Sequence, residues 1–169
     1  MRILETRLQH WPDEAATQAF CEQWARVLVQ HPSLMNASIE LHGTLGAGKT
    51  SLVRHLLRAL GVQGRIKSPS YAVMESYALD ANHGAALVSH FDFYRFDDPR
   101  EWEDAGFRDV FAAPGLKLSE WPEKAAGMLP LPDLQICIEV ADDDSRQVKL
   151  HAGTAPGVEL LNRLIGGLA

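Results

Sequence analysis

The segment Gly43–Thr50, with the sequence GTLGAGKT, constrains this chain most, because it matches the pattern G-x-x-x-x-G-K-[ST]. It follows a short apolar run, ASIELH, and it leads into a helical pattern whose apolar face is formed by Leu52, Val53, Leu56, Leu57 and Leu60. Glycines allow successive backbone N–H groups to turn toward an anion, and the start of the next helix adds the positive end of its dipole. This order of strand, loop and helix predicts a phosphate-binding loop (P-loop).

The chemistry of the loop assigns a role to several of its residues. Lys49 is expected to reach the β- and γ-phosphates of a nucleotide as a point charge, which makes it a candidate catalytic residue. The hydroxyl of Thr50 is expected to ligate Mg²⁺. The full set that we predict to bind the nucleotide at this loop is Gly43, Thr44, Leu45, Gly46, Ala47, Gly48, Lys49, Thr50 and Ser51.

Length and composition favour one soluble domain over residues 1–169. The chain is 46% hydrophobic and 22% charged, which is ordinary globular usage. Its net charge of −6 disfavours direct binding of nucleic acid unless a local basic patch or a partner protein supplies the contact. No apolar run is long enough to cross a membrane, so we expect a cytoplasmic protein. Cys21 and Cys137 lack metal-site spacing and are expected to be buried free thiols.

Strand and helix patterns alternate along the chain, which predicts an α/β fold of the P-loop NTPase-like type, a three-layer sandwich with a mixed sheet. A strand is expected at 2–8, with Leu4, Thr6 and Leu8 on one side, followed by a helix capped by Asp13. Gly61 is expected to end the helix after the P-loop. The remaining predicted elements are strands within 65–79 and 85–96, a helix after Asp97 or Asp98, strands at 115–121, 134–141 and 147–153, and a helix at 156–168.

Two acidic residues end apolar runs and are candidates for metal and water chemistry. Asp92 ends AALVSHFD, and Glu120 ends GLKLSE. In P-loop enzymes a carboxylate near the end of a neighbouring strand holds Mg²⁺. We expect one of the two to hold the metal and the other to orient or deprotonate the attacking water, although either alone is as readily a helix cap. Spacing does not assign the two roles.

Other features carry weaker predictions. Ser68 and Ser70 of SPSY lie where a switch loop that senses the γ-phosphate is found in P-loop proteins, although an ordinary Ser-Pro turn fits as well. The remaining residues are interpreted as structural: His42 and His90 in strands, the aromatic residues Tyr94, Trp102 and Trp121 in the core or an interface, and the acidic run 142–144 in a solvated turn.

Four motifs in order, GTLGAGKT, SPSY, HFDFYR and SEWP, resemble the bacterial TsaE (YjeE) family, ATPases that assist synthesis of N6-threonylcarbamoyladenosine (t6A) on tRNA. The resemblance extends to about Pro132. It implies that Thr50 and Glu120 hold Mg²⁺ and that Asp92 activates water or supports the metal. It also implies that Glu14 and Thr17 approach the adenine. Ser70 replaces the threonine of the usual SPTY and keeps the hydroxyl.

The same resemblance implies ATP and Mg²⁺ as ligands and the proteins TsaB and TsaD as partners. Those partners would hold the tRNA, and hydrolysis of ATP would reset the assembly, which suits an acidic chain. The main alternative is a small-molecule or nucleoside P-loop kinase, which is expected to have an Arg-rich lid and an acceptor pocket. A GTP-operated switch lacks support because no NKxD motif is present. An adapter that only binds nucleotide is the third possibility, and measured phosphate release would separate these classes.

Overall fold

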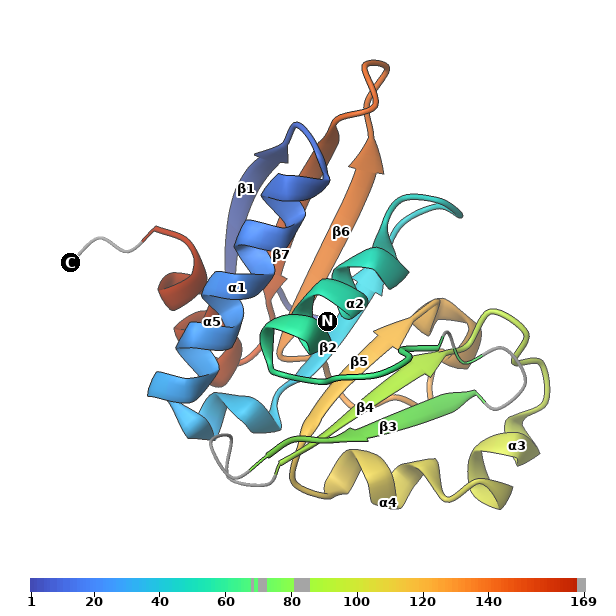
Figure 1. Cartoon of the computed structure of the whole chain (residues 1–169). Helices are drawn as coiled ribbons and strands as arrows, with labels where there is room; N and C mark the ends of the chain where they lie inside the picture. The colour runs from blue at the N-terminus through green and yellow to red at the C-terminus, as the bar shows by residue number, and fades with distance from the viewer. Residues whose placement is uncertain (68, 70–72, 81–85, 167–169) are drawn as a thin grey trace.

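The computed structural model describes residues 1–67, 69, 73–80 and 86–166. Within these ranges seven strands form one sheet in the order β1-β7-β6-β2-β5-β4-β3 (Figure 1). The central pairs β6–β2, β2–β5 and β5–β4 are parallel, whereas β1–β7, β7–β6 and β3–β4 are antiparallel. The strands are β1 (Glu5–Trp11), β2 (Ser38–His42), β3 (Met74–Ala78), β4 (Leu87–Asp92), β5 (Leu116–Glu120), β6 (Leu134–Val140) and β7 (Arg146–Ala152). The predicted mixed sheet is therefore confirmed.

Helices lie on both faces of the sheet. One face packs against α1 (Glu14–Gln30), α2 (Lys49–Ala59) and α5 (Ala155–Leu164), whose buried side chains share one core with the strands (Figure 1). On the other face, α3 (Pro99–Asp104) and α4 (Phe107–Ala112) pack on the β4 end through a second, aromatic core. Short 3₁₀ helices follow α1 and β5, namely η1 (Pro32–Asn36) and η3 (Pro122–Ala125).

The aromatic core explains why the second face is covered at one end. Phe91 near the end of β4 and Phe93 just after it belong to the same core and stack at 5.6 Å between ring centroids. Phe107 meets Phe91 edge-on at 5.4 Å, and Trp102 packs on Phe107 at 5.6 Å. Burial of such rings is the main stabilisation available to helices as short as α3 and α4.

Local signals at the helix ends are confirmed. Asp13 caps α1, because its side-chain oxygen accepts a hydrogen bond from the backbone N–H of Ala16 at 3.0 Å. Gly61 follows the C-cap of α2 with φ of +92°, and its N–H donates to the carbonyl oxygen of Arg58. Asp98 caps α3, with its side-chain oxygen accepting a hydrogen bond from the backbone N–H of Arg100 at 2.9 Å.

Other expectations were wrong. Strand β1 begins later than expected and turns the predicted apolar side outward, leaving Leu8 68% exposed, because the opposite side of the strand packs toward the helices. The helix after Asp98 is two helices, since Gly106 has φ of +69° between them. Cys21 is fully buried, but Cys137 is only partly buried. The expected turn at 82–84 and the SPSY residues 68, 70 and 71 lie outside the described residues.

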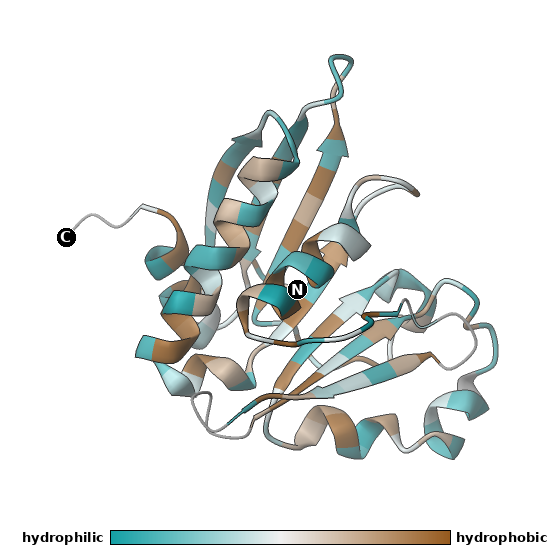
Figure 2. Ribbon diagram, viewed as in Figure 1, coloured by the Kyte–Doolittle hydropathy of each residue, from teal (hydrophilic) through white to brown (hydrophobic). Residues whose placement is uncertain are grey.

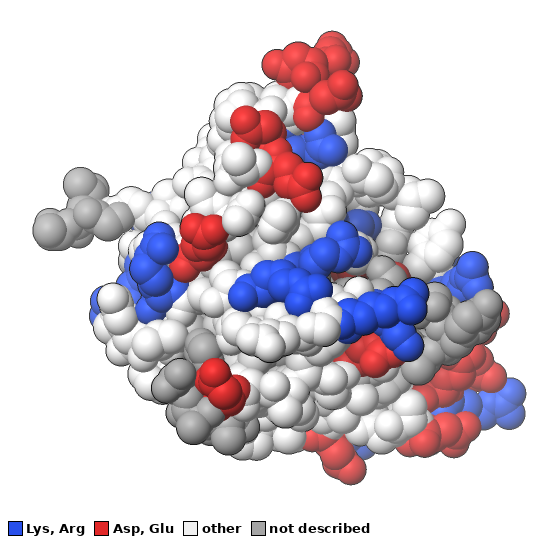
Figure 3. Space-filling model, viewed as in Figure 1, with Lys and Arg blue, Asp and Glu red and all other residues white. Residues whose placement is uncertain are grey.

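Hydropathy and charge are distributed unevenly over this fold. The apolar residues of α1 and α2 are buried in the core against the sheet, and Figure 2 shows an apolar tip on the loop between β2 and α2. Figure 3 shows acidic atoms at the turn between β6 and β7 and along α3, with basic atoms gathered over α2 and the segment after it. Of the helices within the described ranges, none is both long and apolar enough to cross a bilayer.

Candidate nucleotide site

The P-loop joins the carboxyl end of β2 to the first turn of α2. Gly43 lies so close to β6 that a Cβ there would be 2.7 Å from the carbonyl oxygen of Ile138. Gly48 caps α2 with φ of +110°, a conformation that L side chains rarely adopt. Both glycines are therefore required by the backbone path, and the free N–H groups at the start of α2 are available to an anion.

Lys49 folds back onto the loop that carries it. Its ammonium donates to the carbonyl oxygen of Gly43 at 2.5 Å and lies 3.6 Å from the centroid of the Trp121 ring. Trp121 has φ of 55°, an unusual conformation for a non-glycine residue, which places the ring directly after Glu120. Burial lowers the pKa of Lys49, while the carboxylates of Glu120, Glu123 and Asp92 act in the opposite direction.

Glu120 lies at the centre of a buried polar network. The hydroxyl of Thr50 donates to Glu120 at 2.9 Å from Oε1 and 3.1 Å from Oε2. On the other side, Nε2 of His90 lies 2.6 Å from Oε2. Glu120 is 3% exposed and His90 only 1%, so these contacts replace water around the carboxylate. A hydroxyl and a carboxylate held together beside a P-loop are oxygen ligands of the kind that Mg²⁺ prefers.

Asp92 occupies the neighbouring strand end, paired in register with Glu120. Its carboxylate accepts the backbone N–H of Tyr94 at 3.0 Å, which fixes the side chain at the end of β4. Burial raises the pKa of Asp92, the Tyr94 N–H lowers it, and the nearby charge of Glu120 raises it further. The structure thus brings both acids to one edge of the sheet and puts Glu120 in contact with Thr50.

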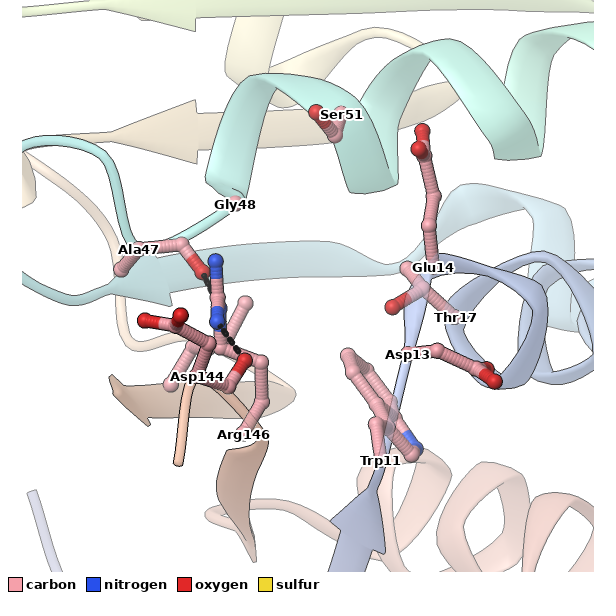
Figure 4. A pocket seen from close by; sticks show the side chains of 10 residues that line it. Trp11, Asp13, Glu14, Thr17, Ala47, Gly48, Ser51, Asp144 and Arg146 are labelled. Atoms are coloured by element: carbon pink, nitrogen blue, oxygen red, sulfur yellow. Dashed lines mark hydrogen bonds between the residues drawn. The ribbon is translucent and has the colours of Figure 1, made fainter. Parts of the chain in front are cut away.

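A pocket opens on the other side of the P-loop, between α1, the start of α2 and the β6–β7 turn (Figure 4). Thr17 and Ser51 contribute hydroxyl groups, and Thr17 is 8% exposed. Glu14 points toward α2, where its carboxylate lies 2.9 Å from Nε2 of His55. The full lining is Trp11, Asp13, Glu14, Thr17, Ala47, Gly48, Ser51, Ile138, Asp144 and Arg146.

Arg146 lines this pocket and also contacts the P-loop. Its Nε donates to the carbonyl oxygen of Ala47 at 2.8 Å, and its Nη1 donates to the carbonyl oxygen of Asp144 (Figure 4). The guanidinium therefore holds the β6–β7 turn against the phosphate-binding segment. The acidic run 142–144 is exposed, as expected of a solvated turn, but Asp144 also lines the pocket, to which no residue of this run was assigned.

The structure places the predicted residues in two adjoining groups. Lys49, Thr50, Asp92 and Glu120 meet at the strand ends, while Glu14, Thr17 and Ser51 line the pocket with Ala47 and Gly48. Thr44, Leu45 and Gly46 form the exposed tip of the loop, and Ser70 lies outside the described residues.

The contacts of two further residues were not predicted, since His90 was interpreted only as a structural residue in a strand and Arg146 had no assigned role. His90 shared the HFDFYR motif with Asp92, so its position two residues before a candidate acid was the available signal. Arg146 gave no such signal, because its contact with Ala47 depends on where β7 lies in the sheet.

Comparisons with known proteins agree on one family. The family model described as threonylcarbamoyl adenosine biosynthesis protein TsaE matches residues 11–148. The tRNA threonylcarbamoyladenosine biosynthesis protein TsaE of Haemophilus influenzae is 37% identical over 159 residues, covering 94% of this chain and 98% of that protein. The protein of the same name from Bacillus subtilis is 35% identical over 114 residues, 68% of each chain.

A solved structure supports the fold. The crystal structure of YdiB from Bacillus subtilis has a TM-score of 0.74 and 23% identity, covering 97% of both chains. Together with the family match, these observations show that the chain belongs to the TsaE family of threonylcarbamoyl adenosine biosynthesis proteins.

Proposed function

We propose that this chain binds ATP with Mg²⁺ and hydrolyses it to ADP and phosphate in support of t6A modification of tRNA. The observation that carries the proposal is the hydrogen bond from Thr50 to both oxygens of Glu120, at 2.9 and 3.1 Å, beside a complete P-loop. A paired hydroxyl and carboxylate at the start of the phosphate-binding helix fit the metal of a Mg²⁺–nucleotide complex.

The residues divide the work by position. Backbone N–H groups of the P-loop and the start of α2 bind the phosphate oxygens, and Lys49 adds a positive charge at the β- and γ-phosphates. Thr50 and Glu120 hold Mg²⁺, which neutralises charge on the phosphates when bound. Glu14, Thr17, Ser51, Ala47 and Gly48 line the pocket that takes the nucleoside.

Asp92 acts on the attacking water. Its raised pKa makes the carboxylate a better proton acceptor than an ordinary aspartate. The water oxygen bonds to the γ-phosphorus, the bond from that phosphorus to the bridging oxygen of ADP breaks, and the water proton passes to Asp92. Lys49 must first leave the carbonyl oxygen of Gly43 and the ring of Trp121, so nucleotide binding changes the contacts of this side chain.

We further propose that TsaB and TsaD are the protein partners and that tRNA is reached through them. The net charge of −6 supports this proposal, because an acidic protein is not expected to bind tRNA tightly without partners. Partner binding would raise the rate of hydrolysis. The resemblance of the four motifs to the TsaE family supports this assignment.

The test is phosphate release from ATP, measured for the chain alone and with TsaB and TsaD. We expect a slow intrinsic rate that rises with the partners, and no hydrolysis by the variant Lys49→Ala in either case. Hydrolysis by Lys49→Ala at the wild-type rate would contradict the proposal. Transfer of the γ-phosphate to an added nucleoside in place of water would identify the alternative, a P-loop kinase.

A further inference from the structure

A strip of positive charge runs along the outer surface of α2 and the segment that follows it. Arg54 and Arg58 lie one helical turn apart on α2, and Arg65 and Lys67 follow in the segment 61–67. All four side chains belong to exposed residues. Figure 3 shows basic atoms in the middle of the molecular face, away from the acidic atoms at the top of the view, with a smaller group of acidic atoms directly beneath them. We call Arg54, Arg58, Arg65 and Lys67 the basic strip.

The charges of the basic strip are not neutralised by the part of the chain that the structure describes. There, none of the four side chains forms an ion pair with a carboxylate, and Arg58 donates to the carbonyl oxygen of Val62 at 2.9 Å. Glu14, the acid that α1 directs toward α2, is engaged by His55. Like charges four residues apart destabilise a helix slightly. The strip is therefore a cationic surface without a direct ion pair among the described residues, on a chain with an overall negative charge.

An apolar side chain accompanies the strip. Leu45, at the tip of the P-loop, is 76% exposed, and the loop runs directly into α2, which carries Arg54 and Arg58. Figure 2 shows this apolar tip on the same face of the molecule as the basic atoms of Figure 3. Arginine is among the residues enriched in protein–protein interfaces, and an exposed apolar side chain on the same face adds apolar area that a partner could bury.

The observations favour a protein over RNA as the ligand of this surface. An RNA backbone would meet the overall charge of −6 and the exposed acidic turn at 142–144 as well as the strip. Single-stranded RNA is also held by aromatic rings that stack on bases. The exposed ring of Tyr94 instead packs against Trp121, with 5.0 Å between centroids.

We infer that the basic strip and Leu45 form the docking surface for a partner protein whose contact face is rich in carboxylates. The inference rests on the proposed function, which calls for a protein partner, and adds where that partner binds and by which chemistry. Because α2 begins at the P-loop, a partner seated here contacts both the loop and the helix that hold the phosphates. Docking at this surface places the partner against α2 and the tip of the P-loop, next to the nucleotide site but outside its pocket.

Two double variants of equal charge change test this inference. Arg54→Glu with Arg65→Glu reverses the strip, and Arg2→Glu with Arg108→Glu reverses two other exposed arginines, at the N-terminus and on α4. We measure binding to the TsaB–TsaD pair over a series of salt concentrations, and binding of ADP as a control for the intact site. The strip variant should lose about tenfold or more in affinity at low salt, with a flatter salt dependence. The control variant should stay within about twofold of wild type, and both should bind ADP normally.

The possible outcomes separate the two proposals. If wild type binds TsaB–TsaD and the strip variant binds equally well, the docking surface lies elsewhere and the inference is wrong. If wild type itself does not bind the pair, the proposed partnership fails first and this inference with it. If the strip variant keeps the protein partner but loses affinity for a tRNA transcript offered alone, the strip is an RNA surface and the inference is overturned. Retained binding by Arg54→Lys with Arg65→Lys supports an electrostatic role.

Discussion

Glu120 shows how a buried charge is made tolerable and useful at the same time. A carboxylate that is 3% exposed would be strongly unfavourable without partners, and here Thr50 and His90 contact it from opposite sides. His90 comes from β4 and Thr50 from α2, so the orientation of the carboxylate is fixed by two different elements. Such fixed orientation is what a metal ligand needs from its surroundings.

The variant Glu120→Gln tests this role at the level of a single residue. Glutamine keeps the size and can still accept from Thr50, but it removes the negative charge that attracts Mg²⁺. We expect nucleotide affinity in the presence of Mg²⁺ to fall at least about tenfold, while affinity in the presence of a chelator stays close to wild type. Titration of a fluorescent ADP analogue with and without Mg²⁺ measures both. An equal loss under the two conditions would exclude a metal-specific role for Glu120.

At the scale of elements, α1 depends on a cap that also borders the pocket. Asp13 satisfies the N–H of Ala16 at the start of a helix of 17 residues, and it lines the pocket next to Glu14. Replacing it by alanine leaves an N–H of the first turn without its side-chain acceptor. The stability of the whole α1 layer should therefore respond to one side chain on the surface.

We expect Asp13→Ala to lower the free energy of unfolding by about 1 kcal/mol. Urea denaturation followed by circular dichroism measures the change, and the slope of the transition should stay constant because the exposed surface is unaltered. Asp13→Asn is the matched control, since asparagine caps as well as aspartate and should restore most of the loss. Equal destabilisation by both variants would show that the charge of Asp13, rather than its cap, stabilises α1.

The elements that sequence patterns predicted best are those with both an apolar period and an end signal. Helix α1 has Asp13 at its start and α2 has Gly61 at its end, and both were found as expected. The outward face of β1 was missed because a seven-residue strand at a sheet edge lacks a decisive alternation of apolar residues. The break at Gly106 was missed because a single glycine inside a helical pattern is often tolerated.

On the scale of the whole molecule, the site was predictable only where its residues are local in sequence. The P-loop and the two strand-end acids follow from short motifs, because parallel strands bring their carboxyl ends to one edge. Contacts that depend on strand order could not be predicted, since β6 and β7 lie on the other side of β2 from β5. Arg146 reaches Ala47 only through that arrangement. The net charge of the chain likewise could not predict the basic strip, because the strip depends on where the charged residues lie on the surface and not on their sum.

The two cysteines provide a measure of the stability of the whole fold. Cys21 is fully buried in the core between α1 and α2, where its thiol lies 3.4 Å from the carbonyl oxygen of Leu52. Burial, with a smaller contribution from the charge of Glu22, raises the pKa of the Cys21 thiol to about 12. Because the reactive form is the thiolate, Cys21 in the folded chain should be inert near neutral pH. Cys137 on β6 is partly exposed, and burial raises its pKa as well.

We therefore expect iodoacetamide to label Cys137 of the native protein at pH 8 well before Cys21. Labelling of Cys21 requires opening of the core, so its rate should rise with urea in parallel with global unfolding and fall when nucleotide stabilises the folded state. Mass spectrometry of the two cysteine peptides over time measures both rates, and Cys137→Ala supplies a control in which only Cys21 reacts. Rapid labelling of Cys21 in the absence of urea would mean that α1 and α2 separate without global unfolding.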